Sequence, residues 1–337
     1  MSATAQVRWG ILGTARIALR SVLPAFRAAP HATAVAIAAR DVRRAHEAAT
    51  QFGIERVSES YDALLADPAL DAVYVPLPND LHARWTLRAL EAGKHVLCEK
   101  PIALDTAQAH AIAAKARETG RYVSEAFMIR YHPQWRRAVE LVRSGELGDL
   151  LAVQSWFAYD NPPGDNLRNS PVHGGGGLYD IGGYALVAGR LLFADDPVRV
   201  IGLFERDAQY GVDRLTHGLV AFPRGRQLSF GVSTRLPRLQ SVVAHGTRAR
   251  LVIETPFNPL PERPTRILID DGRDLYGAGA RVETIPPADQ YAAQLESFST
   301  AILSHRPPEY GIEDALVNMR SLDALFRSER SGTWEHP

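Results

Sequence analysis

The sequence lacks several features that mark particular classes of protein. Its 337 residues include one cysteine, Cys98, which excludes a disulfide framework and a cysteine-rich metal site and fits a reducing compartment. Basic and acidic residues number 38 each, so no net charge attracts nucleic acid or an anionic membrane. No apolar run approaches the ~20 residues of a membrane helix, and the N-terminus lacks a signal-peptide pattern. These absences predict a cytoplasmic protein with no nucleic-acid or membrane partner.

The length and the hydrophobic pattern indicate two domains. A chain of 337 residues suits two domains of roughly 100–200 residues each. In its first part, helical patterns separate short apolar runs, which are residues 7–12, 33–39, 71–77, 94–98 and 121–127. This alternation predicts βαβ units on a parallel sheet. We therefore expect a dinucleotide-binding Rossmann domain over residues 1–125.

The pattern changes in the second part of the chain. Residues 160–177 are rich in Pro, Gly, Asn and Ser, as in a loop, and residues 178–193 read as a helix. Six short alternating segments then predict an antiparallel sheet, and they are residues 198–205, 215–222, 226–233, 241–246, 249–254 and 265–270. We expect residues 126–337 to form an α/β domain on a large, mostly antiparallel open sheet, for substrate binding and oligomerisation.

The stretch "RWGILGTARIA" (8–18) reads as a strand, a tight glycine turn and a helix start. It fits the dinucleotide motif G-x-G-x-x-G/A with Gly13 first and Ala15 in place of the middle glycine. That substitution leaves open a plain strand–helix turn, but the position in the first βαβ unit favours nucleotide binding. The candidate cofactor-binding residues of this turn are Gly13, Thr14, Ala15, Arg16 and Ile17.

Arg40 follows the second predicted strand, where an NAD-specific site carries an acidic residue for the ribose 2′-hydroxyl. An arginine there can pair with a 2′-phosphate instead. The alternative is that Arg40, Arg43 and Arg44 form a solvated helix start, with Asp41 beside them. We favour NADP(H) over NAD(H).

Polar residues also follow the third and fourth major strands. Ligands of open α/β sheets bind at the carboxyl ends of strands, so these residues should face the cofactor. Pro101 disfavours a helical backbone for Lys100 and holds it extended at the strand end. The candidates here are Leu77, Pro78, Asn79, His82, Glu99 and Lys100. Neither His82 nor His132 has a partner at metal-ligand spacing, so no metal site is predicted.

The second domain contains "GGGGLYDIGGY" (174–184), in which Asp180 and Tyr184 are four residues apart and share a helix face. The glycines before them permit a close approach to the first helical turn. A phenol beside a carboxylate can exchange a proton with a substrate oxygen. The alternative for each residue alone is a core tyrosine and an aspartate that caps a turn.

These segments, with "VPLPNDLH" and "AGKHVLCEKPIA", resemble the glucose–fructose oxidoreductase / inositol dehydrogenase / MocA (GFO/IDH/MocA) family in order and spacing. The resemblance covers nearly the whole chain and implies a Rossmann domain followed by an open-sheet domain that commonly forms dimers or tetramers. It also implies that Lys100 and Tyr184 are the catalytic pair. The helix face that Asp180 shares with Tyr184 predicts that Asp180 assists them. A tyrosine at this position is similar to the glucose–fructose oxidoreductase, dihydrodiol dehydrogenase and NADP-dependent xylose dehydrogenase branch.

The predicted activity is hydride transfer between NADP(H) and a sugar or polyol, with Tyr184 exchanging the proton. Further candidates for substrate contact, besides the catalytic residues, are Arg130, Arg168 and His173, each of which has a purely structural alternative. The alternatives for the whole protein are a reductase of nucleotide-bound ketosugars and a non-catalytic NADP-binding sensor of the same fold. A sensor is expected to have lost the lysine or the tyrosine, and both are present here.

Overall fold

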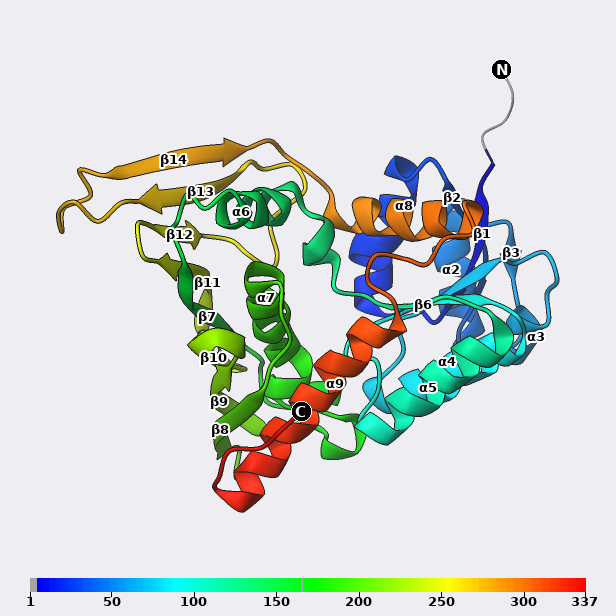
Figure 1. The fold of residues 1–337 in the computed structure, drawn as a ribbon. Coiled ribbons are helices and arrows are strands. Elements are labelled where there is room, and N and C mark those ends of the chain that lie inside the picture. The colour runs from blue at the N-terminus through cyan, green and yellow to red at the C-terminus, as the bar shows by residue number, and fades with distance from the viewer. Residues whose placement is uncertain (1–4, 165) are drawn as a thin grey trace. The chain divides into compact units, whose positions relative to one another are not determined.

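The protein, represented by a computed structural model, is described over residues 5–164 and 166–337 and divides into two units (Figure 1). Unit 1 holds the chain up to Met128 together with Gln290–Met319. Unit 2 holds Ile129–Asp289 and Arg320–Pro337. Each unit is built around its own sheet.

Unit 1 contains the parallel sheet that the sequence predicted. Its strands are β1 (Val7–Leu12), β2 (Ala32–Ala38), β3 (Arg56–Val57), β4 (Ala72–Val75), β5 (His95–Cys98) and β6 (Val123–Glu125). They pair in parallel in the order β3-β2-β1-β4-β5-β6. The order reverses beside β1, which is the switch point where such sheets bind dinucleotides.

Helices connect these strands. They are η1 (Ala18–Val22), α1 (Leu23–Ala25), η2 (Phe26–Ala28), α2 (Val42–Phe52), α3 (Tyr61–Leu65), α4 (Asn79–Glu91) and α5 (Thr106–Thr119). The Asp105 side chain caps α5 by accepting a hydrogen bond from the Gln108 N–H at 2.7 Å. Gly120 ends the same helix in the left-handed conformation.

One later segment also belongs to unit 1. Helix α8 (Gln290–Leu303) buries Leu295 and Phe298 in the core that surrounds Trp9. The Trp9 indole N–H donates to the Ser299 hydroxyl at 3.1 Å. The division at residue 125 therefore differs from the packing, because α8 returns to the first sheet. The return depends on packing between α8 and Trp9 of β1, which are far apart in the sequence, so the local pattern around α8 could not indicate it.

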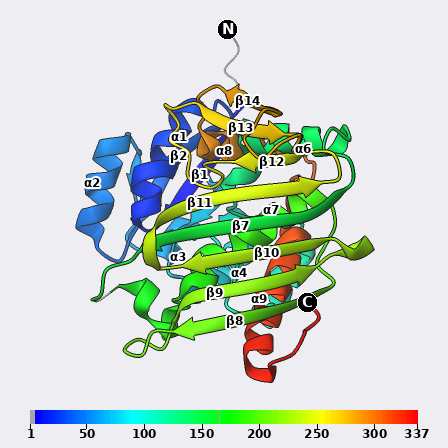
Figure 2. The same ribbon diagram turned by 90° about the vertical axis from the view of Figure 1, so that its left-hand side faces the viewer.

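Unit 2 is built on an eight-stranded sheet, shown face on in Figure 2. Its strands are β7 (Leu150–Asp160), β8 (Arg199–Arg206), β9 (Asp213–Ala221), β10 (Gln227–Ser233), β11 (Arg235–Gly246), β12 (Arg250–Ile253), β13 (Thr265–Asp270) and β14 (Ala280–Ile285). Their order is β14-β13-β12-β11-β7-β10-β9-β8. The pair β7 and β10 is parallel and the others are antiparallel, so the sheet is mostly antiparallel, as predicted.

Helices α6 (Pro133–Arg143) and α7 (Gly183–Phe193) pack on this sheet. The π-helical turn η6 (Leu178–Gly182) leads directly into α7, so residues 178–193 are helical, as expected. The shorter 3-10 turns are η3 (Met128–Tyr131), η4 (Leu167–Asn169), η5 (Pro171–His173) and η7 (Pro223–Gly225). The last helix, α9 (Ile312–Ser331), begins in unit 1 and ends in unit 2.

Candidate active site

The glycine turn of unit 1 follows β1. Gly13 has φ +111°, and its N–H donates to the Ala38 carbonyl at 2.7 Å. A Cβ on this glycine would lie 3.1 Å from the Leu77 side chain, so the turn needs glycine both for conformation and for space. Thr14 is buried, and its carbonyl accepts a hydrogen bond from the Arg44 guanidinium at 3.0 Å. The turn therefore has the backbone that the motif predicts, with Ala15, Arg16 and Ile17 leading into the first helical turns.

The three arginines after β2 have different surroundings. Arg43 pairs with Glu47 at 2.6 Å, and Arg44 binds the Thr14 carbonyl. Asp41 caps α2 by accepting from the Arg44 N–H. Arg40 is exposed and makes no ion pair with any residue that the structure describes. Its guanidinium is thus the one of the three best placed to bind an anion.

The E-K-P segment (Glu99–Pro101) follows β5, and hydrogen bonds to Glu99 and from Ile102 hold the chain before and after Lys100. The buried Tyr74 hydroxyl donates to Glu99 Oε1 at 2.7 Å, and burial together with this carboxylate raises the pKa of Tyr74 well above its usual value. On the other side, the Ile102 N–H donates to Glu125 Oε1 at 2.9 Å. The Lys100–Pro101 peptide is cis, and the Lys100 side chain is half-buried.

The loop after β4 lies beside this segment. Leu77 is buried, and Pro78 and Asn79 are half-buried at the start of α4. The His82 ring is fully buried, and each of its nitrogens faces a backbone carbonyl, that of Leu77 or that of Pro101. The structure thus brings the loops after β1, β4 and β5 together, as the sequence analysis expected. It leaves His82 no ring nitrogen for a ligand.

In unit 2, Tyr184 lies on α7 and is 5% exposed. Its ring packs against Phe157 and Phe257, with centroids 5.5 and 5.4 Å away. Phe157 and Phe257 also stack on each other, so the ring orientation of Tyr184 is fixed by an aromatic cluster. The rigidity of this cluster is what a precisely directed hydroxyl requires.

Asp180 lies on η6, one turn before Tyr184. Its Oδ2 accepts from Arg168 Nε at 2.9 Å and from the Tyr159 hydroxyl. Burial and the Asp180 charge raise the pKa of Tyr159, so its hydroxyl keeps its proton. The same carboxylate raises the pKa of Arg168. Arg168, predicted to contact substrate, is therefore also the ion-pair partner of Asp180.

The loop that carries Arg168 is ordered by asparagines. Asn161 donates to Asn169 at 3.0 Å, and Asn166 donates to Asn161 at 2.7 Å. His173 is half-buried at the end of η5, next to the glycine run. Arg130, the other substrate candidate, is 5% exposed in η3 and lies in the interior of the protein.

Asp213 was not identified from the sequence, yet it fixes the start of η6. Its Oδ2 accepts from the Leu178 N–H at 2.7 Å and from the Thr216 hydroxyl at 2.9 Å. A Cβ on Gly176 would lie 2.0 Å from Asp213 Oδ1, which explains one glycine of the run. Asp213 is 1% exposed, and burial raises its pKa to about 6. The glycine run signalled a close approach, but not the residue approached.

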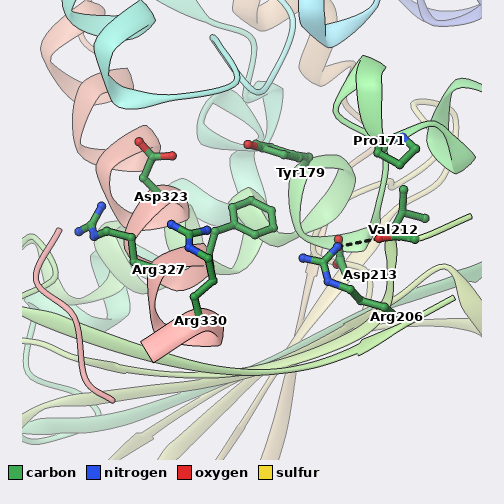
Figure 3. A pocket seen from close by; sticks show the side chains of 11 residues that line it. Pro171, Tyr179, Arg206, Val212, Asp213, Asp323, Arg327 and Arg330 are labelled. Carbon is green, nitrogen blue, oxygen red and sulfur yellow. Dashed lines mark hydrogen bonds between the residues drawn. The ribbon is translucent and has the colours of Figure 1, made fainter. Parts of the chain in front are cut away.

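A cavity of about 420 Å³ opens beside this turn in unit 2 (Figure 3). Tyr179 of η6 lines the cavity, and its ring packs against that of Phe326 of α9 with centroids 4.7 Å apart and planes tilted by 42°. Arg206, Arg327 and Arg330 supply guanidinium groups. Glu329 binds Arg206 in a bidentate pair at 2.7 and 2.6 Å, so part of this positive charge is neutralised. Asp213 and Asp323 also line the cavity, so its lining combines guanidinium groups, carboxylates and aromatic rings and suits a polar ligand.

Two properties of the described residues concern membranes and metal ions. Over residues 5–164 and 166–337, no helix is both long and apolar enough to cross a bilayer. Within the same ranges, no group of three or more His, Cys, Asp or Glu side chains is arranged to hold a metal ion.

Two family models match this chain. Residues 7–127 match the oxidoreductase family with an NAD-binding Rossmann fold, and residues 135–252 match the GFO/IDH/MocA C-terminal domain. The matches correspond to the parallel sheet of unit 1 and to the larger part of the sheet of unit 2.

Similar proteins cover almost the whole chain. An uncharacterized oxidoreductase of Rhizobium meliloti is 46% identical and covers 98% of each chain. D-xylose 1-dehydrogenase (NADP(+)) 2 of Haloferax volcanii is 38% identical, over 96% of this chain and 98% of its own. The crystal structure of a 3-ketoreductase from Actinomadura kijaniata, in complex with NADP and TDP-benzene, matches with a TM-score of 0.90 and 33% identity. That match covers 96% of this chain and 98% of the ketoreductase. This chain therefore belongs to the GFO/IDH/MocA family of oxidoreductases.

Proposed function

We propose that this oxidoreductase uses NADP(H) to interconvert a carbinol and a carbonyl group on a sugar or polyol. Lys100 and Tyr184 carry the proton transfer, with Asp180 as an orienting residue. Unit 1, around β1 to β6, binds the cofactor, and unit 2 binds the substrate. The single cysteine, buried and free, fits an enzyme that works in the cytoplasm.

Unit 1 has the features that a dinucleotide requires. The glycine turn after β1 leaves room for a close approach to the backbone, and the sheet order reverses beside it. The loops after β4 and β5 border the same end of the sheet. The nicotinamide, when bound, would supply or take up the hydride. The chain's own residues orient it and exclude water.

Arg40 supports NADP(H) as the cofactor. An exposed guanidinium without an ion pair among the described residues can bind the 2′-phosphate through charge-assisted hydrogen bonds. The Haloferax dehydrogenase carries NADP(+) in its name, and the Actinomadura ketoreductase was crystallised with NADP. These relatives support the same preference here.

The observation that carries the catalytic proposal is that both Lys100 and Tyr184 are present, each in a fixed local structure. Structures of the Actinomadura ketoreductase include one with a tyrosine changed to phenylalanine and others with a lysine changed to alanine or glutamate. That lysine and that tyrosine are separated by as many residues as Lys100 and Tyr184. The same spacing supports the same pair as the functional one in this chain.

The proposed roles follow from the side-chain chemistry. The Tyr184 hydroxyl can give a proton to, or accept one from, the substrate oxygen at which charge changes. The Lys100 ammonium can stabilise negative charge on that oxygen. Because Arg168 and Tyr159 both donate to Asp180, the carboxylate is held in one orientation one helical turn from Tyr184.

A nucleotide-bound ketosugar is the second candidate substrate. The cavity beside Tyr179 favours it, because Arg206, Arg327 and Arg330 line that cavity together with the Phe326 ring. Guanidinium groups bind phosphate oxygens well, and an aromatic face can stack on a sugar or a base. A neutral pentose has no phosphate group to pair with these guanidinium groups.

Turnover of NADPH and NADP⁺ by the purified protein tests the proposal. The substrate panel contains aldoses, ketosugars, vicinal diols and nucleotide-bound ketosugars, and Lys100→Met serves as the comparison. We expect turnover with at least one class and a ~10²–10⁴-fold loss in the variant, with unchanged cofactor affinity. Tight NADPH binding without turnover of any class would instead favour the sensor.

We also propose that the chain forms a homodimer or homotetramer through the open face of the unit 2 sheet. Leu203 of β8 and Leu219 of β9 point to the same face and are 76% and 52% exposed. Both leucines line a cavity of about 640 Å³, and Trp156 of β7 lines it too. Contiguous exposed apolar side chains of this kind mark protein–protein contacts.

A further inference from the structure

His82 occupies an unusual position in unit 1. It lies in the first part of α4, and its side chain is 0% exposed. Its Nδ1 lies 2.7 Å from the Pro101 carbonyl oxygen, and its Nε2 lies 2.7 Å from the Leu77 carbonyl oxygen. Both ring nitrogens therefore face hydrogen-bond acceptors at close hydrogen-bonding distance.

The number of protons on the ring decides how many of these contacts are hydrogen bonds. A backbone carbonyl oxygen only accepts. A neutral imidazole has one N–H, so it can donate to one carbonyl while its other nitrogen turns a lone pair toward the second oxygen. Only the imidazolium, with a proton on each nitrogen, can donate to both.

The two carbonyls belong to the two loops that matter for the proposed site. Pro101 directly follows Lys100, and Leu77 packs against the Gly13 turn after β1. Tyr74 already holds Glu99, and Glu125 holds the Ile102 N–H. The Glu99 N–H donates to the Val75 carbonyl at 3.1 Å, and the His82 ring adds a side-chain contact between the residue next to Lys100 and the loop after β4.

We propose that His82 is a positioning residue for Lys100, joining the two loops by one hydrogen bond when neutral and by two when protonated. This proposal rests on the proposed function only for the role of Lys100, because the tie itself lies within unit 1. The placement of Lys100 thus depends on the protonation of a buried side chain whose two ring nitrogens both face backbone carbonyls.

The surroundings of the ring set the pH at which the second proton is added. Burial lowers the pKa of His82 below its usual value, and the charge of Lys100 acts in the same direction. The Pro101 and Leu77 carbonyls and the Asp80 carboxylate oppose this. Because the net direction is downward, the ring is neutral at neutral pH, and the second hydrogen bond forms on acidification.

Nitrogen NMR of the native protein tests the tie directly. The ¹⁵N resonances of the His82 ring and the amide resonance of Ile102 are followed from about pH 8 down to the lowest pH at which the protein stays folded. We expect one protonated ring nitrogen at the upper end, two at the lower end, and the same midpoint for Ile102. A ring that gains its second proton without any response at Ile102 would overturn the proposal.

A variant tests the consequence for catalysis. In His82→Gln, the amide group can donate to one carbonyl but cannot gain a second donor on acidification. We expect a roughly 10- to 100-fold slower single-turnover hydride transfer, near-normal NADPH affinity, and loss of the acid-side step in the pH profile. A variant with the native rate and pH profile would contradict the proposal.

His95→Gln is the matched control. His95 is also buried in unit 1, and its Nδ1 accepts from the Tyr122 N–H at 2.9 Å, away from the Lys100 loop. The His95→Gln variant should be less stable than the native protein but should keep the native pH dependence of hydride transfer. The same altered pH dependence in both variants would count against a specific role of His82. If the native protein turns over no substrate, the proposed function fails while the NMR titration still decides the tie.

Discussion

At the scale of single residues, the proposed site differs from place to place in whether its charges are paired. Arg168 and Asp180 form an ion pair, and Glu99 accepts a hydrogen bond from Tyr74. The buried Asp213 carboxylate accepts two hydrogen bonds. Arg40 differs, because no described acidic residue pairs with it. Two of these residues give direct predictions.

Arg40→Asp should weaken NADP(H) binding strongly and improve NAD(H) binding, because an acidic residue repels the 2′-phosphate and accepts from a ribose hydroxyl. Arg43→Asp is the control, since Arg43 is already paired with Glu47 and should matter less. Fluorescence titrations with both cofactors measure the effect. A native preference for NAD(H), or equal effects of the two substitutions, would contradict the role given to Arg40.

Asp213→Asn should change how stability depends on pH. The folded pKa of about 6 lies above the unfolded value of ~3.9, so this group stabilises the fold at low pH. That contribution is lost as pH rises through about 6. Relative to the variant, the native protein should lose up to ~3 kcal/mol of unfolding free energy between about pH 4 and pH 7. Urea unfolding at several pH values measures this difference, and a constant difference would refute the assignment.

At the scale of elements, the turn that starts η6 decides the placement of Asp180 and Tyr184. Gly176 lies in this turn with φ +107°, and a Cβ there would meet the Asp213 carboxylate at 2.0 Å. The turn, the Asp213 carboxylate and the start of η6 therefore depend on one another for their positions. A side chain at this position should disturb all three.

Gly176→Ala and Gly164→Ala separate backbone strain from collision. Gly164 has φ +122°, but a Cβ added there would meet no atom within 4 Å, so its substitution should cost only ~1–2 kcal/mol of conformational energy. Gly176→Ala should cost a further ~1–3 kcal/mol through overpacking and should slow turnover. Thermal unfolding and turnover of both variants give the comparison. Equal losses of stability would show that the Asp213 contact is unimportant.

Much of the fold could be predicted from the sequence at this scale. Alternating apolar runs placed the parallel strands to within a few residues, and the six alternating segments between 198 and 270 are all in the large sheet. β3, β7 and β14 were missed, and β3 has only two residues. β14 is largely exposed along its length, so its sequence shows little apolar pattern. β7 ends where the loop rich in Pro, Gly, Asn and Ser begins, and the sequence analysis assigned only that loop.

The candidate site could be predicted only in part, because its supports are distant or are backbone atoms. The glycine turn, the E-K-P segment and the Asp180–Tyr184 pair were all visible as motifs. Asp213 lies more than one element away from the glycines that it contacts. The partners of His82 are carbonyl groups, which every residue has, so no sequence pattern could identify them.

At the scale of the whole molecule, the open face of the unit 2 sheet is the surface on which the proposed oligomer depends. Leu203→Glu places a charge among the exposed side chains of that face and should reduce the oligomeric state. Leu275→Glu is the control, because Leu275 is 99% exposed outside the strands. Light scattering after gel filtration measures the mass. A native monomer, or an unchanged mass for Leu203→Glu, would contradict the proposed interface.

The central claim is that Tyr184 exchanges the proton in a hydride-transfer reaction, and Tyr184→Phe tests it most directly. The substitution keeps the ring and its packing against Phe157 and Phe257 and removes only the hydroxyl. The single-turnover rate with NADPH and a carbonyl substrate should fall ~10²–10⁴-fold, while NADPH affinity and the unfolding midpoint stay near native. A stable variant that reacts at the native rate would contradict the account.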